Sequence, residues 1–499
     1  MLNYLAQGFS IAITFQNVLL MIIGSILGIV FAAIPALTFS TALVLMIPLT
    51  FGISPVAAIS VLLGVYAGGM TGGSISSILL GIPGTPSAAA TVIDGYQMTK
   101  KGEAGKALGV AIYSSIFGGL VSLLVLILVA KPITSLAIKF GPAEMFALVI
   151  FGLSTIVGLS EASMVKGLLS GLFGLLLCTV GMDPVIGFPR FTFGFTNLMV
   201  GVDIMPVMIG MFALPEVMDS FIFASQTRHN PVEKVKQSVS ASFPTVKEMK
   251  GLFSINLRSS LIGTMIGAIP GSGGPIAIFM AYDMAKKQYP KVGTGVIEGI
   301  AAPESANNGV TGGALIPLLT LGIPGDSATA IVLGALMIHG IAPGPLLFRD
   351  NAPMVYAIFI SLFLINLIVL VLQFGGMKLF VKVLDIPKVN LMSMILVVSV
   401  VGAFAVGMNY ADIIIMFGAG FLGYIMKRFD FPVVPLILGL VLGSIIETNF
   451  RRSLMFSSGN LAIFYTNPFV IIFLLLSLAM ILGPAIRNQR ASKKAKNGK

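Results

Sequence analysis

The chain has 499 residues, of which 56% are hydrophobic and only 10% are charged, and its mean hydropathy is +1.01. Soluble domains average ~45–50% apolar and ~25% charged residues, so this composition excludes a soluble globular protein and indicates a polytopic protein of the lipid bilayer. The net charge of +11 does not indicate nucleic-acid binding, because the Lys and Arg residues form short clusters between apolar stretches, a pattern typical of membrane topology.

The N-terminal segment, residues 1–16, reads MLNYLAQGFSIAITFQ and lacks the basic start of a signal peptide. We expect it to be retained as an interfacial helix. Lys100 is the first cation, so about five membrane-spanning lengths of chain, at ~20 residues each, precede any positive charge.

Two apolar stretches contain the same helix-breaking motif, GIPGTPS at 81–87 and GIPGDSA at 322–328. A Pro between glycines interrupts a helix and leaves backbone N–H and C=O groups unpaired. At membrane depth such backbone is tolerated only inside the protein or beside a water-filled cavity. The motif therefore predicts a broken membrane helix at each place.

The surroundings of the two motifs are duplicated as well. GIVFAAIP at 28–35 resembles GTMIGAIP at 263–270, and TGGSISSILLGIPGT at 71–85 resembles TGGALIPLLTLGIPGD at 311–326. The second pair has an offset of 240 residues (311 − 71), with one extra residue before the second GIPG. We predict two copies of one unit, repeat 1 at 17–225 and repeat 2 at 252–450, joined by a basic cytoplasmic linker at 226–251.

Positive charge indicates that the copies are inverted. Lys100, Lys101 and Lys106 follow the first motif, whereas the stretch after the second motif has no Lys or Arg before Arg349. Short loops rich in Lys and Arg stay in the cytoplasm, so matching loops lie on opposite sides and the N-terminus is periplasmic.

The C-terminal segment 451–486 has no counterpart in repeat 1, and an additional span there would return the basic tail 487–499 to the cytoplasm. Arg451 and Arg452 would then lie near the outer face, against the charge rule. Packing or attraction to an anion would explain these two residues.

Inverted repeats with helices broken at matching positions are typical of secondary transporters. The N–H groups of a half-helix attract an anion, and unwound carbonyls coordinate a cation. The alternative is a packing kink, since Gly and Pro are frequent in membrane helices. Duplication and neighbouring polar residues favour a substrate-binding role for Gly84, Thr85, Ser87, Asn307, Asn308, Gly325, Asp326 and Ser327.

Two further features lie near the second motif. APESANNGVTGG at 302–313 brings Glu304, Asn307 and Asn308 into an apolar segment, where polar groups by default suggest function, although Asn pairs also bond helices together. GAIPGSGG at 267–274 is another interruption, and its counterpart in repeat 1 lacks the glycines. Asn307, Asn308 and Asp326 are candidate sodium ligands, but the sequence does not decide between sodium and a proton as the coupling ion. We expect no other cofactor.

Other classes of function have less support. Cys178 is the only cysteine, and His229 and His339 stand in different segments, so the sequence has no disulfide framework and no familiar metal motif. No base accompanies a nucleophile at suggestive spacing, so we do not expect an enzyme. An anion channel, or a membrane scaffold subunit without its own substrate site, remains an alternative.

The long segments that contain the motifs, 72–109 and 302–345, resemble the large membrane subunit of the tripartite tricarboxylate transporter family. The resemblance spans nearly the whole chain, including GAIPGSGG and ETNFRRSL at 447–454. It implies cation-coupled import of tricarboxylate or dicarboxylate anions across a bacterial inner membrane. The implied partners are a small membrane subunit and a periplasmic solute-binding protein that delivers the organic anion. Relatives often have Asn in place of Gly81 and a small or hydroxyl residue in place of Asp326, so Asp326 is a candidate cation or proton group.

We therefore predict an all-α polytopic membrane protein. Two inverted-topology repeats would place their broken helices, or re-entrant hairpins, at a shared midplane site, with an extra C-terminal span. By resemblance to ion transporters in general, one part would move against a framework in an elevator-like manner.

Overall fold

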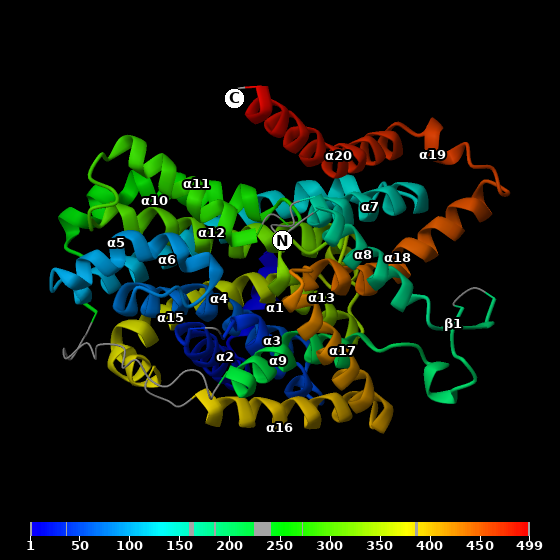
Figure 1. The fold of residues 1–499 in the computed structure, drawn as a ribbon, viewed down its shortest axis with the longest axis horizontal. Coiled ribbons are helices and arrows are strands. Elements are labelled where there is room, and N and C mark those ends of the chain that lie inside the picture. The colour runs from blue at the N-terminus through cyan, green and yellow to red at the C-terminus, as the bar shows by residue number, and fades with distance from the viewer. Residues whose placement is uncertain are drawn as a thin grey trace. The chain divides into compact units, whose positions relative to one another are not determined.

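The computed structural model describes residues 2–35, 37–158, 164–183, 186–223, 241–271, 273–384 and 388–497, nearly all of them in helices (Figure 1). Residues 226–240 of the predicted basic linker lie outside the described residues. Seven helices in the described part are long and apolar enough to cross a membrane: α2, α4, α6, α9, α15, α17 and α18. The protein is an all-α polytopic membrane protein, as the composition predicts.

The chain divides into two compact units, and unit 1 comprises residues 1–134 and 216–406. Its α-helices begin with α1 (Leu2–Ala12), α2 (Phe15–Ala33), α3 (Phe39–Met46), α4 (Pro55–Leu80), α5 (Ala89–Lys100) and α6 (Ala104–Ala137). Its second group comprises α10 (Val246–Gly267), α11 (Gly273–Gln288), α12 (Glu298–Leu321), α13 (Ser327–Ile338), α14 (Leu347–Asp350), α15 (Ala352–Val383) and α16 (Lys388–Gly407). The short 3₁₀ helices η1 (Pro48–Thr50) and η2 (Pro86–Ala88) also belong to it.

Unit 2 comprises residues 135–215 and 407–499. Its helices are α7 (Pro142–Gly158), α8 (Met164–Cys178), most of α9 (Ile204–Phe223), α17 (Tyr410–Arg428), α18 (Val433–Phe456), α19 (Ile463–Thr466) and α20 (Pro468–Asn497). A two-stranded antiparallel hairpin, β1 (Gly181–Met182) and β2 (Pro189–Arg190), follows α8 and precedes η3 (Thr196–Leu198). Each unit thus combines parts of both predicted repeats.

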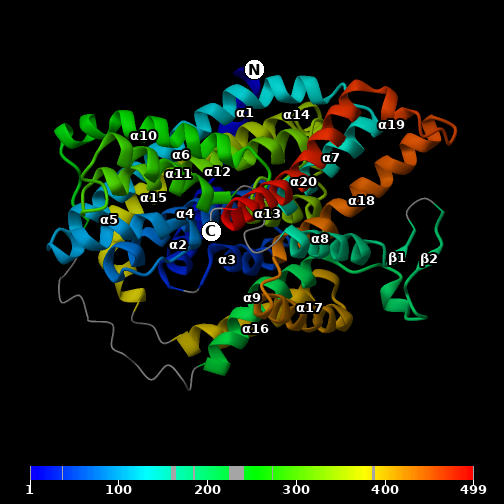
Figure 2. The same ribbon diagram turned by 45° about the horizontal axis from the view of Figure 1, so that its top comes forward.

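Helix pairs in unit 1 repeat the same close contact. A Cβ at Gly68 of α4 would meet the carbonyl oxygen of Ser25 in α2, and a Cβ at Gly309 of α12 would meet that of Ser260 in α10. These contacts relate the copies by 241 residues in α4 and α12 (309 − 68) and by 235 residues in α2 and α10 (260 − 25). The offset for α4 is one greater than the 240 at which the TGG letters match. The side-by-side arrangement of α10, α11 and α12 is visible in both views (Figures 1 and 2).

Both long central helices end where the motifs predict. The C-cap of α4 is Gly81 with φ 69°, and that of α12 is Gly322 with φ 74°. Glycine adopts this left-handed conformation without the steric cost of a Cβ, so it ends the helix and redirects the chain. Each break therefore separates a long buried helix from a shorter one, α5 or α13.

Candidate functional site

The first break presents two hydroxyl groups that are poorly bonded within the protein. Thr85 and Ser87 are buried, with 2% and 7% of their surfaces exposed. Their hydroxyl oxygens lie 3.4 Å apart, which is long for an O–H···O bond, and the Thr85 side chain does not cap η2. A Cβ at neighbouring Gly84 would meet the carbonyl oxygen of Ala32. The break is thus packed tightly against α2 while its hydroxyls keep bonding capacity.

The second break ends differently, in a helix capped by the protein's own carboxylate. Asp326 Oδ1 accepts from the backbone N of Thr329 at 2.8 Å and from its hydroxyl at 2.7 Å. The Asp326 backbone N donates to Thr329 Oγ1 at 2.9 Å, which completes a capping box at the start of α13. Asp326 Oδ2 accepts from the Tyr66 hydroxyl of α4 at 2.5 Å. Three bonds occupy most of the accepting capacity of this carboxylate, so the geometry disfavours Asp326 as an open sodium ligand.

The structure brings Ser87 and Asn307 together at the start of α11. A Cβ at Gly274 would lie 2.6 Å from Ser87 Cβ and 3.4 Å from Asn307 Oδ1. Asn307 is fully buried in α12, and its Nδ2 donates to the carbonyl of Met70 at 2.8 Å. Its Oδ1 has no hydrogen-bond partner among the residues that the structure describes. We call Thr85, Ser87, Gly274 and Asn307 the Ser87–Asn307 cluster.

The residues at the equivalent positions of the other copy form a second cluster, in which larger side chains fill the space. The offsets of 235 and 241 relate Phe39 to Gly274, Tyr66 to Asn307 and Asp326 to Thr85. The Phe39 and Tyr66 rings pack at 5.9 Å between centroids, and Tyr66 donates to Asp326. In this Tyr66–Asp326 cluster an aromatic ring stands where the other cluster has Gly274, and a carboxylate stands where it has a neutral hydroxyl.

The remaining predicted site residues surround these clusters in unit 1. The Asn308 side chain is satisfied between helices, accepting from Thr71 at 3.2 Å and donating to the Glu304 carbonyl at 3.2 Å. Gly325 O accepts from Gly271 N at 2.8 Å, so the loop that precedes α11 touches the second break, while Gly274 in the first turn of α11 lies beside Ser87. Ser327 is partly exposed in the first turn of α13.

Two buried acids join α5 and α6 to the second half of unit 1, and sequence reasoning did not assign them to the site. Asp94 of α5 is fully buried and accepts from the Tyr282 hydroxyl and from three backbone N–H groups, of Gly293, Gly295 and Val296. Glu304 of α12 is fully buried between hydroxyls of α5 and α6. An acid in an apolar stretch is the signal in the sequence, but its partners come from distant segments.

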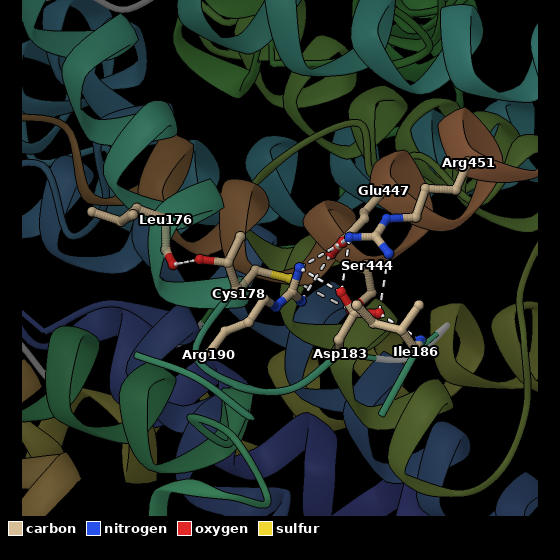
Figure 3. Close-up of polar contacts among 9 residues, drawn as sticks. Leu176, Cys178, Asp183, Ile186, Arg190, Ser444, Glu447 and Arg451 are labelled. Atoms are coloured by element: carbon tan, nitrogen blue, oxygen red, sulfur yellow. Dashed lines mark hydrogen bonds and ion pairs between the residues drawn. The ribbon is translucent and has the colours of Figure 1, made fainter. Parts of the chain in front are cut away.

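Arg451 belongs to a network of ion pairs in unit 2 (Figure 3). Arg451 donates to both Asp183 oxygens, at 3.0 and 2.8 Å, and lies 2.7 Å from Glu447. Arg190 of β2 donates to both Glu447 oxygens, at 2.6 and 3.1 Å, which raises the pKa of Arg190. Two guanidinium groups thus neutralise two carboxylates, and the hairpin is tied to α18. Arg451 is held by the protein's own carboxylates.

Comparison with known proteins finds a family model and two relatives. Residues 18–438 match the Tripartite tricarboxylate transporter TctA family. The chain is 35% identical over 496 residues, 98% of each chain, to "Uncharacterized 52.8 kDa protein in TAR-I ttuC' 3'region" of Agrobacterium vitis. It is also 36% identical over 234 residues to "Uncharacterized protein in TAR-II ttuC' 3'region" of the same organism, covering 46% of this chain and 97% of that protein. No solved structure matches.

Proposed function

Because the chain belongs to the tripartite tricarboxylate transporter TctA family, we propose that it carries organic carboxylate anions through the Ser87–Asn307 cluster. The observation that carries the proposal is the fully buried Asn307 Oδ1, which has no partner in the described part of the chain and lies beside the poorly bonded hydroxyl of Ser87. Buried polar groups normally have partners, so this pair leaves bonding capacity for a ligand.

The chemistry of the cluster suits a carboxylate. Ser87 and Thr85 supply hydroxyl donors, and Gly274, in the first turn of α11, lies beside Ser87. The first N–H groups of a helix have no intrahelical partner. A helix N-terminus adds favourable dipole charge for an anion. Asn307 Oδ1 accepts from a hydroxyl or carboxylic acid group of the substrate, or contacts a cation that travels with it.

The wider proposal follows the family. The chain is the large membrane subunit of a cation-coupled importer in a bacterial inner membrane, with a periplasmic N-terminus and a cytoplasmic C-terminus. A small membrane subunit and a periplasmic solute-binding protein are its partners, and the latter delivers the anion. The two compact units supply a part that moves and a part that stays, as an elevator-like carrier requires.

The test is uptake by the reconstituted complex in proteoliposomes. Radiolabelled citrate, succinate, malate and benzoate are offered under sodium and proton gradients imposed separately. A carrier shows saturation with substrate and accumulation against a gradient. Conduction without saturation would identify an anion channel, and full activity of the partner subunits without this chain would identify a scaffold.

A further inference from the structure

Glu304 is a buried carboxyl group beside the proposed anion site. It lies three residues before Asn307 in α12, so the two side chains are neighbours on one helix face. Its Oε1 accepts from the Thr91 hydroxyl of α5 at 2.6 Å, and its Oε2 accepts from the Ser115 hydroxyl of α6 at 2.9 Å. Glu304 therefore connects α12 to the helix that follows the first break.

Within the described ranges, no positive charge compensates a charge on Glu304. Its side chain is 0% exposed, and no Lys or Arg of the described ranges forms an ion pair with it. Burying an ionised carboxylate without a cation is far more costly than burying the neutral acid. Two hydroxyl partners suit either state, since a hydroxyl donates to the carboxylate and accepts from the protonated acid.

Other titratable groups on the elements around α12 are engaged elsewhere or face away. Asp94, one turn beyond Thr91 on α5, is held by backbone N–H groups and Tyr282. Arg258 of α10 lies ~200° around that helix from Asn256, which accepts from Ser305 of α12. Groups engaged elsewhere are Tyr66 with Asp326, Lys106 with Glu248, Arg349 with Asp350, Lys100 over Tyr96, His339 with Thr50, and Tyr113 against Phe117. Glu298 is partly buried, and the remaining groups are exposed: Lys131, Lys247, Lys250, Asp283, Lys286 and Lys287.

We propose that Glu304 is the proton-coupling site of the transporter. The ionised carboxylate takes one proton from the outer solution when the substrate anion binds at the Ser87–Asn307 cluster, and releases it to the cytoplasm when the anion leaves. Two negative charges at neighbouring sites of low dielectric repel each other, so anion binding and proton binding reinforce one another. The inference rests on the proposed function and adds the identity of the coupling ion.

The test compares Glu304→Gln with the parent complex in proteoliposomes, using the carboxylic acid of the panel that the parent transports best. Gln keeps an acceptor and a donor for Thr91 and Ser115 but cannot exchange a proton. We expect Glu304→Gln to exchange internal for external substrate within about threefold of the parent rate, because exchange needs no net proton movement. We expect accumulation driven by an imposed proton gradient to fall at least tenfold. Glu298→Gln, the same change in the first turn of α12, serves as the matched control.

The outcomes separate this inference from the proposed function. Proton-driven accumulation by Glu304→Gln at the parent level overturns the inference, as does a parent that responds only to sodium. Loss of exchange in a correctly inserted Glu304→Gln protein also overturns it, because Glu304 would then be a brace or a substrate contact. In each of these cases a saturable parent leaves the proposed function standing. A parent that neither exchanges nor accumulates any acid of the panel overturns both.

Discussion

Ser87→Ala is expected to raise the half-saturating substrate concentration by about 10- to 100-fold. The Ser87 hydroxyl is buried, and its bond to Thr85 at 3.4 Å is long against the ~2.7–2.8 Å of a good O–H···O bond, so its loss costs the fold little. A hydrogen bond to a charged group contributes ~1.5–3 kcal/mol. Each ~1.4 kcal/mol changes a binding constant tenfold, which gives the stated range.

The assay is the initial rate of uptake against substrate concentration, normalised to inserted protein. Ser74→Ala is the control, because Ser74 is also buried in α4 and its hydroxyl donates to the carbonyl of Thr71 in its own helix, at 2.7 Å. We expect this variant to stay within about twofold of the parent. If the Ser87 and Ser74 variants give the parent curve alike, Ser87 does not contact substrate and the first break is a packing kink.

Three other predictions concern the site, the ion pairs and the topology. Gly274→Ala should reduce uptake at least tenfold, because its Cβ would lie 2.6 Å from Ser87 Cβ, whereas Gly375→Ala, which enters open space, should transport normally. Arg451→Ala should lower the unfolding free energy by about 1–3 kcal/mol in denaturant titrations, since Asp183 is 2% exposed and loses its bidentate partner; an equal loss in Arg452→Ala would refute the network's role. Cysteines at Lys101, Lys234, Lys287 and Lys494 in a Cys178→Ser background should be protected from impermeant reagents applied outside, and labelling at 101 and 287 would refute the inverted repeats.

The helical class and the two breaks were predictable because their causes are local. A highly hydrophobic chain must pair its backbone N–H and C=O groups internally when it lies in lipid, and a helix does so within one segment. Gly81 and Gly322 each end a long helix in the left-handed conformation, which the GIPG letters predict directly. The orientation of the repeats and the site residues stay predictions, since they depend on a bilayer and a ligand.

The asymmetry between the two clusters was not predictable from the motifs. The letters TGG align at an offset of 240 and the letters GIPG at 241, and the contacts of Gly68 and Gly309 select 241 for α4 and α12. The offset of 241 relates Tyr66 to Asn307, and the offset of 235 between α2 and α10 relates Phe39 to Gly274. The cradle of Asp94 was also hidden, because its N–H donors come from residues 293–296, about 200 positions away along the chain. Side-chain partners across such separations are fixed by packing, which a single sequence does not display.

Asp326→Asn tests why the second break has a carboxylate where the first break has a hydroxyl. Asp326 occupies the place that Thr85 has in the other copy, and its carboxylate already fills the anion position at the start of α13. Asn retains an acceptor for Thr329, so the cap remains while the charge is lost. If the second break is permanently occupied by this internal anion, the variant should keep the parent's dependence on sodium and protons, and its half-saturating concentration should stay equal or fall, since one negative charge has gone. A changed dependence on the coupling ion in uptake assays would make Asp326 a cation or proton ligand. If the variant keeps the parent's dependence on sodium and protons, the first break, whose helix has no such side-chain cap, is the break that is open to substrate.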